Sequence, residues 1–185
     1  SIRYYNIIIE AKTFRGLNRD GILAASLYIS CSINGNPRTA KEIASIFHLD
    51  TTSATKGCKN ALSIINELES GIENKDKTKI NKTTPSSFLE RYCSKLNINK
   101  ELTKLCLFIA NQVEKHNLIP ENTPHSISAG IVYFVCQICN LNVSKRSINN
   151  ISKISEVTIN KCYKKLYVMK DRLIPGKILK KYSNN

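Results

Sequence analysis

The sequence has no tryptophan, one methionine, seven glycines and five prolines, and it has no long apolar run. A membrane-spanning helix needs about 20 consecutive apolar residues, and no stretch of this chain approaches that length. The N-terminus, SIRYYNIIIE, lacks the small-residue cleavage site of a signal peptide. We therefore expect an intracellular protein outside the membrane. Because position 1 is not methionine, we also expect the sequence to be part of a longer one.

Acidic residues are scarce. The chain has 14 Asp and Glu against 28 Lys and Arg, which gives a net charge of +14 and a pI near 9.5. Such a surplus favours a polyanionic partner, either nucleic acid or an acidic protein surface. The surplus is concentrated near the C-terminus, which favours phosphate contact. Between Asn160 and Lys181 a single acid, Asp171, accompanies eight cations: Lys161, Lys164, Lys165, Lys170, Arg172, Lys177, Lys180 and Lys181.

Patterns for catalysis and metal binding are missing as well. His48, His116 and His125 stand apart without a patterned acid or Cys partner, and the chain has no Gly-rich phosphate loop. Seven scattered cysteines are typical of reduced, buried thiols. Cys136-x-x-Cys139 is a single pair inside an apolar run, whereas a zinc site normally takes two such pairs. We expect no catalytic residue, no metal ligand and no cofactor in this chain.

An internal repeat organises the sequence. A shift of 105 positions superimposes residues 22–65 on 127–170 without a gap, with nine identities over 44 positions. The identities coincide with the apolar face of the expected helices, which favours duplication over chance. They include Ile22 and Ile127, Ala24 and Ala129, Tyr28 and Tyr133, Cys31 and Cys136, and Ile43 and Ile148.

Apolar residues three and four positions apart predict three helices in each repeat. The expected ranges are 18–33, 40–46 and 51–69 in the first repeat, and 124–140, 145–151 and 156–173 in the second. N-caps are predicted at Asp50, Thr123, Ser144 and Ser155, with a capping box of Thr39 and Glu42. The short connection between the last two helices of each repeat is typical of a helix-turn-helix.

Two further helices, 85–96 and 100–117, precede these three in the second repeat. Only 2–13 does so in the first, which therefore lacks its opening helix, and truncation explains this most simply. The sequence predicts an all-α protein with two tandem helical repeats. We expect a first repeat at 1–72, a linker at 73–85, a second repeat with a helix-turn-helix at 86–175, and a basic tail at 176–185.

Two five-helix repeats in tandem are the cyclin-box arrangement. Among the families with this arrangement, the sequence motifs resemble transcription initiation factor IIB. RDGILAASLYISCSINGNPRTAKEI resembles the first repeat of that family. FLERYCSKLNI, IANQVEKHNLIPENTPHSISAGIVYF and ISEVTINKCYKKLY resemble the second. The similarity runs from about Arg15 to Pro175. Ile, Asn and Lys make up 66 of 185 residues, which suggests an AT-rich genome such as that of a large DNA virus or a parasitic eukaryote.

The resemblance implies a core that binds the TATA-binding protein on promoter DNA and helps recruit RNA polymerase. It also implies a nuclear location, or a cytoplasmic viral factory for a viral protein, and we expect a monomer. The family's zinc ribbon normally precedes the core and is not in this sequence. The alternative is a cyclin that regulates a kinase. The basic C-terminal region and the EVTIN turn argue against it, since kinase binding needs no phosphate-facing helix.

In the family, the second helix-turn-helix enters the major groove upstream of the TATA element. The matching residues here are Val157, Thr158, Asn160, Lys161 and Lys164. Most relatives carry Arg at the position of Asn160. Arg pairs with guanine and Asn with adenine, so we predict a preference shifted toward adenine, or lost. The alternative is that Asn160 is merely solvated.

The resemblance implies further contacts in the first repeat and in one loop of the second. Arg15, Gly16, Leu17 and Asn18 form the loop that leads into the first helix of the first repeat, 18–33. We expect this loop to contact DNA downstream of the TATA element. Relatives have Arg at the position of Leu17. They also have Arg in the matching loop of the second repeat, where this chain has Asn122. Lys56 and Lys59 match basic positions that meet the TATA-binding protein, and the alternative for each is a solvated surface.

Overall fold

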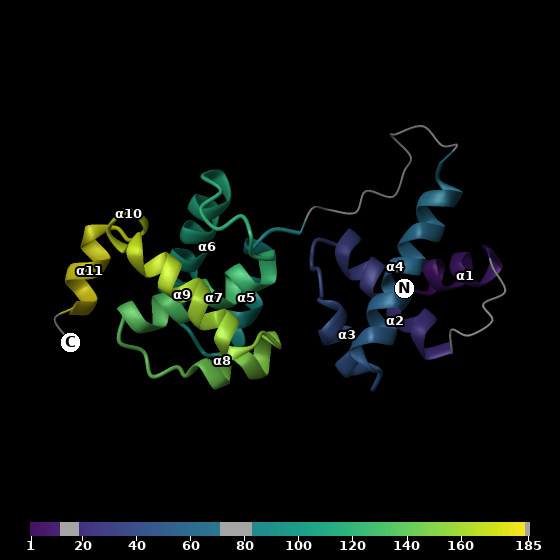
Figure 1. Ribbon diagram of the computed structural model, residues 1–185, viewed down its shortest axis with the longest axis horizontal. Helices are drawn as coiled ribbons and strands as arrows, with labels where there is room; N and C mark the ends of the chain where they lie inside the picture. The colour runs from purple at the N-terminus through teal and green to yellow at the C-terminus, as the bar shows by residue number, and fades with distance from the viewer. Residues whose placement is uncertain (12–18, 71–82, 184–185) are drawn as a thin grey trace. The chain divides into compact units, whose positions relative to one another are not determined.

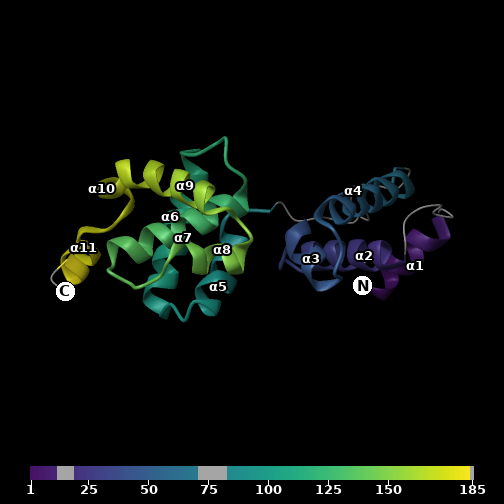
Figure 2. The same cartoon turned by 60° about the horizontal axis from the view of Figure 1, so that its bottom comes forward.

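The computed structural model describes residues 1–11, 19–70 and 83–183, and every regular element in these ranges is a helix. The predicted all-α fold is confirmed. The chain divides into two compact units, Ser1–Thr83 and Thr84–Asn185 (Figures 1 and 2). The first contains α1 (Ile2–Ala11), α2 (Arg19–Ile33), α3 (Ala40–Ile46) and α4 (Thr51–Leu68). The second contains α5 (Ser86–Lys95), α6 (Lys100–Lys115), α7 (Pro124–Ile138), α8 (Lys145–Ser152), α9 (Glu156–Val168), α10 (Lys170–Leu173) and α11 (Gly176–Ser183).

Four of the five predicted N-caps hold their helices as expected. Asp50, Ser144 and Ser155 each accept a hydrogen bond from the backbone N–H three residues on, and Thr39 forms the predicted capping box with Glu42. Thr123 lies at the N-cap of α7, but its side chain makes no capping bond. Its hydroxyl lies 2.8 Å from the hydroxyl of Ser126 instead. Thr123 therefore lies at the predicted N-cap position, but its side chain accepts no hydrogen bond from the backbone of α7.

The predicted single helix 156–173 is wrong, because α9 ends at Val168 and Met169 interrupts it before α10. The first repeat shows what this break achieves. There α4 continues without interruption, and Leu68 at its end is 51% exposed. Leu173, which lies 105 positions after Leu68, is 1% exposed. The break therefore accompanies burial of a leucine, whereas the uninterrupted helix of the first unit leaves its leucine exposed.

Each unit is built around one central helix, α2 in the first unit and α7 in the second. In the second unit α7 packs against α5, α6, α8, α9 and α11, and its residues from Ser126 to Cys136 are all buried. The largest fully buried side chains of this core are Phe88 and Tyr92 of α5 and Phe134 of α7 itself. In the first unit α2 packs against α1, α3 and α4 around Ile8 and Ile29.

The central helix and the third helix of the repeat approach closely because one residue at their crossing lacks a side chain. In the second unit this is Gly130 of α7. A Cβ added there would lie 2.3 Å from the Cβ of Cys162 on α9. In the first repeat the glycine lies on the third helix instead of the central one. Ala25 matches Gly130, and the buried Gly57 of α4 matches Cys162.

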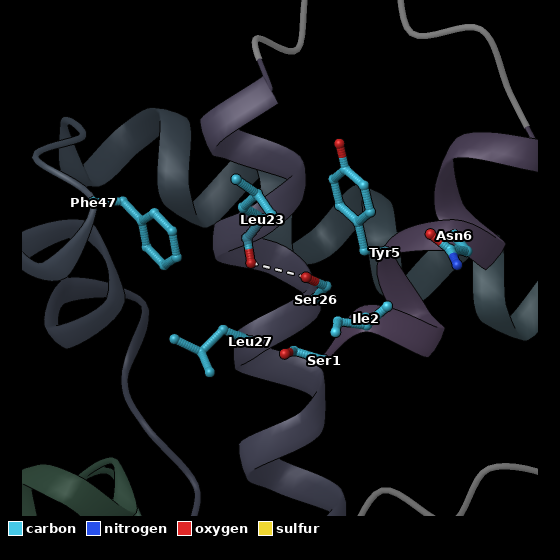
Figure 3. A pocket seen from close by; sticks show the side chains of 8 residues that line it. All are labelled: Ser1, Ile2, Tyr5, Asn6, Leu23, Ser26, Leu27 and Phe47. Atoms are coloured by element: carbon cyan, nitrogen blue, oxygen red, sulfur yellow. Dashed lines mark hydrogen bonds between the residues drawn. The ribbon is translucent and has the colours of Figure 1, made fainter.

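The first unit has a groove of about 380 Å³ where the second unit is filled. Its walls are Ser1, Ile2, Tyr5 and Asn6 from α1, Leu23, Ser26 and Leu27 from α2, and Phe47 after α3 (Figure 3). Ile131 and Val132 match Ser26 and Leu27 in the second repeat, and both are fully buried. There α5 packs on the central helix, and the Ser128 hydroxyl donates to the Pro85 carbonyl at the start of α5, at 2.7 Å. Within the described ranges the first unit has no counterpart of α5.

The last residues, expected as a basic tail, form helix α11, which packs on the second unit. Ile178 and Tyr182 contact its core. Lys181 forms an ion pair with Glu101 of α6 at 2.7 Å, and Asn140 donates a hydrogen bond to the Tyr182 carbonyl at 3.2 Å. One cation of the C-terminal run is therefore paired within the fold.

Replacing Gly130 by alanine is expected to lower the free energy of unfolding by about 1–3 kcal/mol, the usual cost of overpacking a core. The loss should appear although alanine is the better helix former by about 1 kcal/mol. Urea unfolding followed by circular dichroism measures it. Gly176→Ala is the matched control, since nothing lies within 4 Å of the added atom. Adding Cys162→Gly to Gly130→Ala restores room at the crossing, so the double variant should be more stable than the summed losses of the two single variants predict. Losses that simply add would contradict the close approach of the two helices.

Candidate nucleic-acid interface

A helix-turn-helix occupies the end of the second repeat. α8 ends at Ser152, the C-cap residue Lys153 has a left-handed conformation (φ 59°), and α9 begins after Ser155. Side chains stabilise the turn between them. Asn149 donates to the Ile154 carbonyl at 2.7 Å, and the Ile154 N–H donates to the Ser152 hydroxyl at 3.2 Å. The predicted motif is present, with a turn fixed by its own hydrogen bonds.

Helix α9 has a buried face and an exposed one. Ile159, Cys162 and Leu166 are buried at spacings of three and four. On the opposite side lie Val157, Lys161, Lys164 and Val168, all exposed and again three or four residues apart. We call these four residues the α9 outer face. Val157 is 65% exposed and Val168 85%, so the face offers two apolar groups around two ammonium groups.

The structure groups three of the five residues predicted on this helix. Val157, Lys161 and Lys164 belong to the α9 outer face. Asn160 is half-buried at its edge. Thr158 is about 100° around the helix from Val157, and its hydroxyl lies 2.9 Å from the hydroxyl of the capping Ser155. Thr158 therefore contributes to the start of α9 rather than to its outer face.

The loop between α6 and α7 reaches the flank of α9. Lys165 donates a hydrogen bond to the Asn122 side-chain oxygen at 3.3 Å and forms an ion pair with Glu121. Asn122 and α9 were predicted as separate contacts, and this junction brings them together. Sequence reasoning missed Glu121, because no local pattern pairs residues 44 positions apart.

The run of basic residues at the C-terminus does not form one surface. Lys161 and Lys164 lie on the α9 outer face, whereas Lys165 pairs with Glu121 and Lys181 with Glu101. The Lys170 ammonium lies 5.3 Å from the Tyr167 ring centre, in cation–π geometry. Two cations of the run therefore remain for a partner along the face of α9.

An aromatic row supports α9 on one flank. Tyr163 contacts the Tyr133 ring edge-on with centroids 5.2 Å apart, and the Tyr167 ring at 5.6 Å. Burial, and then the neighbouring phenols, raise the pKa of Tyr163. Since these rings join α9 to the buried helix α7, they help to hold the outer face at a fixed orientation.

The predicted residues of the first repeat are only partly described. Lys56 and Lys59 are both exposed on α4, one turn apart, and the neighbouring Ala54 and Cys58 are buried. Arg15, Gly16, Leu17 and Asn18 lie outside the described residues.

Six of the seven cysteines are buried thiols, and Cys31 is half-buried. All seven are free, and the side chains of Cys136 and Cys139 lie in the core of the second unit. Burial is the main cause that raises the pKa of Cys136 to about 12 and of Cys139 to about 11. Among the described residues, no group of three or more His, Cys, Asp and Glu side chains is placed to hold a metal ion.

The Transcription factor TFIIB repeat family model matches residues 2–62 and 78–169, and so covers both helical units. The chain belongs to the transcription factor IIB family. The family predicted from the motifs is therefore confirmed. No helix in the described part of the chain is long and apolar enough to cross a membrane.

Curated relatives carry the same family name. The chain is 38% identical over 152 residues to a putative transcription initiation factor IIB-like protein of Acanthamoeba polyphaga mimivirus, covering 82% of the chain and 32% of that protein. It is 31% identical over 172 residues to transcription initiation factor IIB of Oryza sativa subsp. japonica, and 27% over 169 residues to that of Xenopus laevis. These matches cover 93% and 91% of the chain, and 53% and 50% of the relatives. The chain thus spans about half the length of the plant and frog relatives and a third of the viral one. A viral relative agrees with the source that the composition suggested.

Thiol labelling tests the burial of the cysteines. Cys31 is half-buried, whereas the other six are buried and four of them have pKa values raised to about 11 or 12. The thiolate is the reactive form, so at pH 8 Cys31 should react first with a disulfide reagent. The others should react only as the protein unfolds in urea. Rapid labelling of Cys136 or Cys139 in the folded chain would contradict this core.

Proposed function

We propose that this chain is the core of a general transcription initiation factor that binds a complex of the TATA-binding protein and promoter DNA. In this proposal it contacts DNA beside the TATA element, helps recruit RNA polymerase and catalyses no reaction. Family membership supports a role in transcription initiation. The observation that carries the DNA contact is the helix-turn-helix of the second repeat, with the cationic outer face of α9.

The dimensions and chemistry of α9 fit a major groove. Its 13 residues extend about 20 Å at 1.5 Å per residue, and a B-DNA major groove about 12 Å wide admits an α-helix. Lys161 and Lys164 can meet phosphates, while the exposed methyl groups of Val157 suit the C5 methyl of thymine. α9 begins at Glu156, after its N-cap Ser155. Asn160, which is half-buried on this helix, is proposed to contact a base edge.

The remaining contacts are part of the same proposal. Lys56 and Lys59 are proposed to meet an acidic surface of the TATA-binding protein, because both are exposed on one stretch of α4. Residues Arg15 to Asn18 are proposed to contact DNA on the other side of TATA. We propose a monomer that works in the nucleus, or in a cytoplasmic viral factory if the source is a virus.

A gel-shift experiment tests the function. A TATA-containing duplex with the TATA-binding protein should give a complex that migrates more slowly when this chain is added. A band that stays at the position of the binary complex at every protein concentration and at low salt would overturn the proposal. A pull-down with protein kinases in parallel addresses the cyclin alternative.

Lys161→Met and Lys164→Met should each weaken the ternary complex and reduce its salt dependence. Each phosphate contact contributes about 0.9 to the slope of log K against log salt, so the double variant should lose about 1.8. Fluorescence anisotropy at several salt concentrations measures this slope. Lys95→Met is the control, since Lys95 is exposed on α5, away from α9. Slopes equal to that of the control would show that the α9 outer face does not meet phosphates.

Asn160→Arg should change the preferred base. Selection from a pool with randomised upstream flanks should return adenine, or no preference, at one position for the natural chain. The Arg variant should return guanine there, because Arg pairs bidentately with guanine and each such pair contributes about 1–3 kcal/mol of discrimination. Guanine selected by the natural chain would contradict the role given to Asn160.

A further inference from the structure

An acidic residue lies beside the proposed DNA-binding helix. Glu121 belongs to the loop between α6 and α7, and its carboxylate forms an ion pair with Lys165 of α9. Both side chains are substantially exposed, at 56% for Glu121 and 42% for Lys165. A carboxylate at this position repels a DNA backbone that approaches α9. Glu121 therefore opposes the attraction between DNA and the neighbouring cations of a chain whose net charge is +14.

The loop holds Lys165 at two points. Its ammonium contacts the Glu121 carboxylate and donates to the Asn122 side-chain oxygen at 3.3 Å. The Asn122 N–H in turn donates to the Ile119 carbonyl at 3.2 Å, which fixes the turn. Lys165 follows Lys164 by one residue, so it lies about 100° around the helix, on the flank of the α9 outer face. An ammonium has three N–H donors, and it can therefore turn from this loop toward a phosphate at the same flank.

We propose that Glu121 is a specificity-determining residue that withholds Lys165 from DNA until a correctly placed phosphate replaces the Glu121 carboxylate. The inference rests on the function proposed above. Carboxylate and phosphate are equivalent acceptors for an ammonium, so the exchange is nearly balanced when a phosphate sits at the flank of α9. In a loosely docked complex no phosphate is placed well enough to displace the carboxylate, so Lys165 stays paired with Glu121, and the carboxylate repels the backbone.

Such a repulsive element raises specificity by penalising the wrong complex more than the right one. A chain of net charge +14 binds any duplex through phosphates, and non-specific sites greatly outnumber promoters. Glu121 cancels one cation at the helix that contacts DNA while leaving Lys161 and Lys164 unaffected. Lys165 also places an ammonium at Asn122, the position where the family resemblance implies that an Arg has been lost.

The test compares Glu121→Gln with the natural chain on two ligands. One is a 30-bp duplex without a TATA sequence, and the other is a TATA duplex with bound TATA-binding protein. With Lys165 released, the salt slope on the first ligand should steepen by about 0.9. Its affinity at 0.1 M salt should rise roughly five- to tenfold, the change that one added phosphate contact produces. Affinity for the second ligand should rise less, so that the ratio of specific to non-specific binding falls.

Two variants isolate the pair. Glu90→Gln makes the same charge change on α5, which does not pack against α9, and should leave the slope unchanged. Adding Lys165→Met to Glu121→Gln should return the slope to that of the natural chain. Exposed ion pairs contribute little to stability, so all these variants should unfold at the urea concentration of the natural chain.

The outcomes separate this inference from the function on which it rests. If the natural chain forms the ternary complex but Glu121→Gln behaves like Glu90→Gln on both ligands, the role of Glu121 is wrong and the function stands. An equal gain on both ligands would likewise overturn it, because Glu121 would then weaken binding without discriminating. A natural chain that binds neither ligand at low salt would overturn both proposals.

Discussion

The packing of the third helix against the central helix is the constraint on which both repeats depend. At the crossing of α7 and α9, Gly130 leaves room for the Cβ of Cys162, so the two helices lie closer than side chains ordinarily permit. In the first repeat α2 also packs against α4, and Ala25 and the buried Gly57 stand at the matching positions. Because this contact sets the depth of α9 in the bundle, it also decides which residues of α9 are left outside. The exposed row of Val157, Lys161 and Lys164 is a consequence of how Ile159, Cys162 and Leu166 are buried.

Charge acts on top of this framework, and much of it is used within the fold. Lys165 and Lys181 pair with Glu121 and Glu101, and Lys170 lies over Tyr167. A net charge of +14 therefore overstates the cations available at one surface. In the proposed function a few well-placed ammonium groups meet DNA, and an acid beside them limits indiscriminate binding. This is how a strongly basic chain can still distinguish a promoter from other duplex DNA.

Most helices and their ends could be predicted from the sequence, since they depend on local interactions. Ser155 caps α9 through a residue three positions away, and the apolar character of α7 identified a buried helix. Features set by distant contacts could not be predicted in this way. The break at Met169 accompanies burial of Leu173 in the core of the second unit. On the candidate site, the motifs identified the residues of α9, but only the fold joins Asn122 to Lys165 and reveals Glu121.

Hydroxyl-radical footprinting on a TATA promoter shows whether the chain contacts the DNA that flanks the TATA element. With the TATA-binding protein alone, protection is confined to the DNA that this protein covers. Adding the chain should extend protection into the flanking DNA, upstream where α9 is proposed to enter the major groove. Replacing Lys161 and Lys164 by methionine should remove the upstream extension. A cleavage pattern unchanged by the natural chain, at concentrations well above those used for the binary complex, would contradict the account.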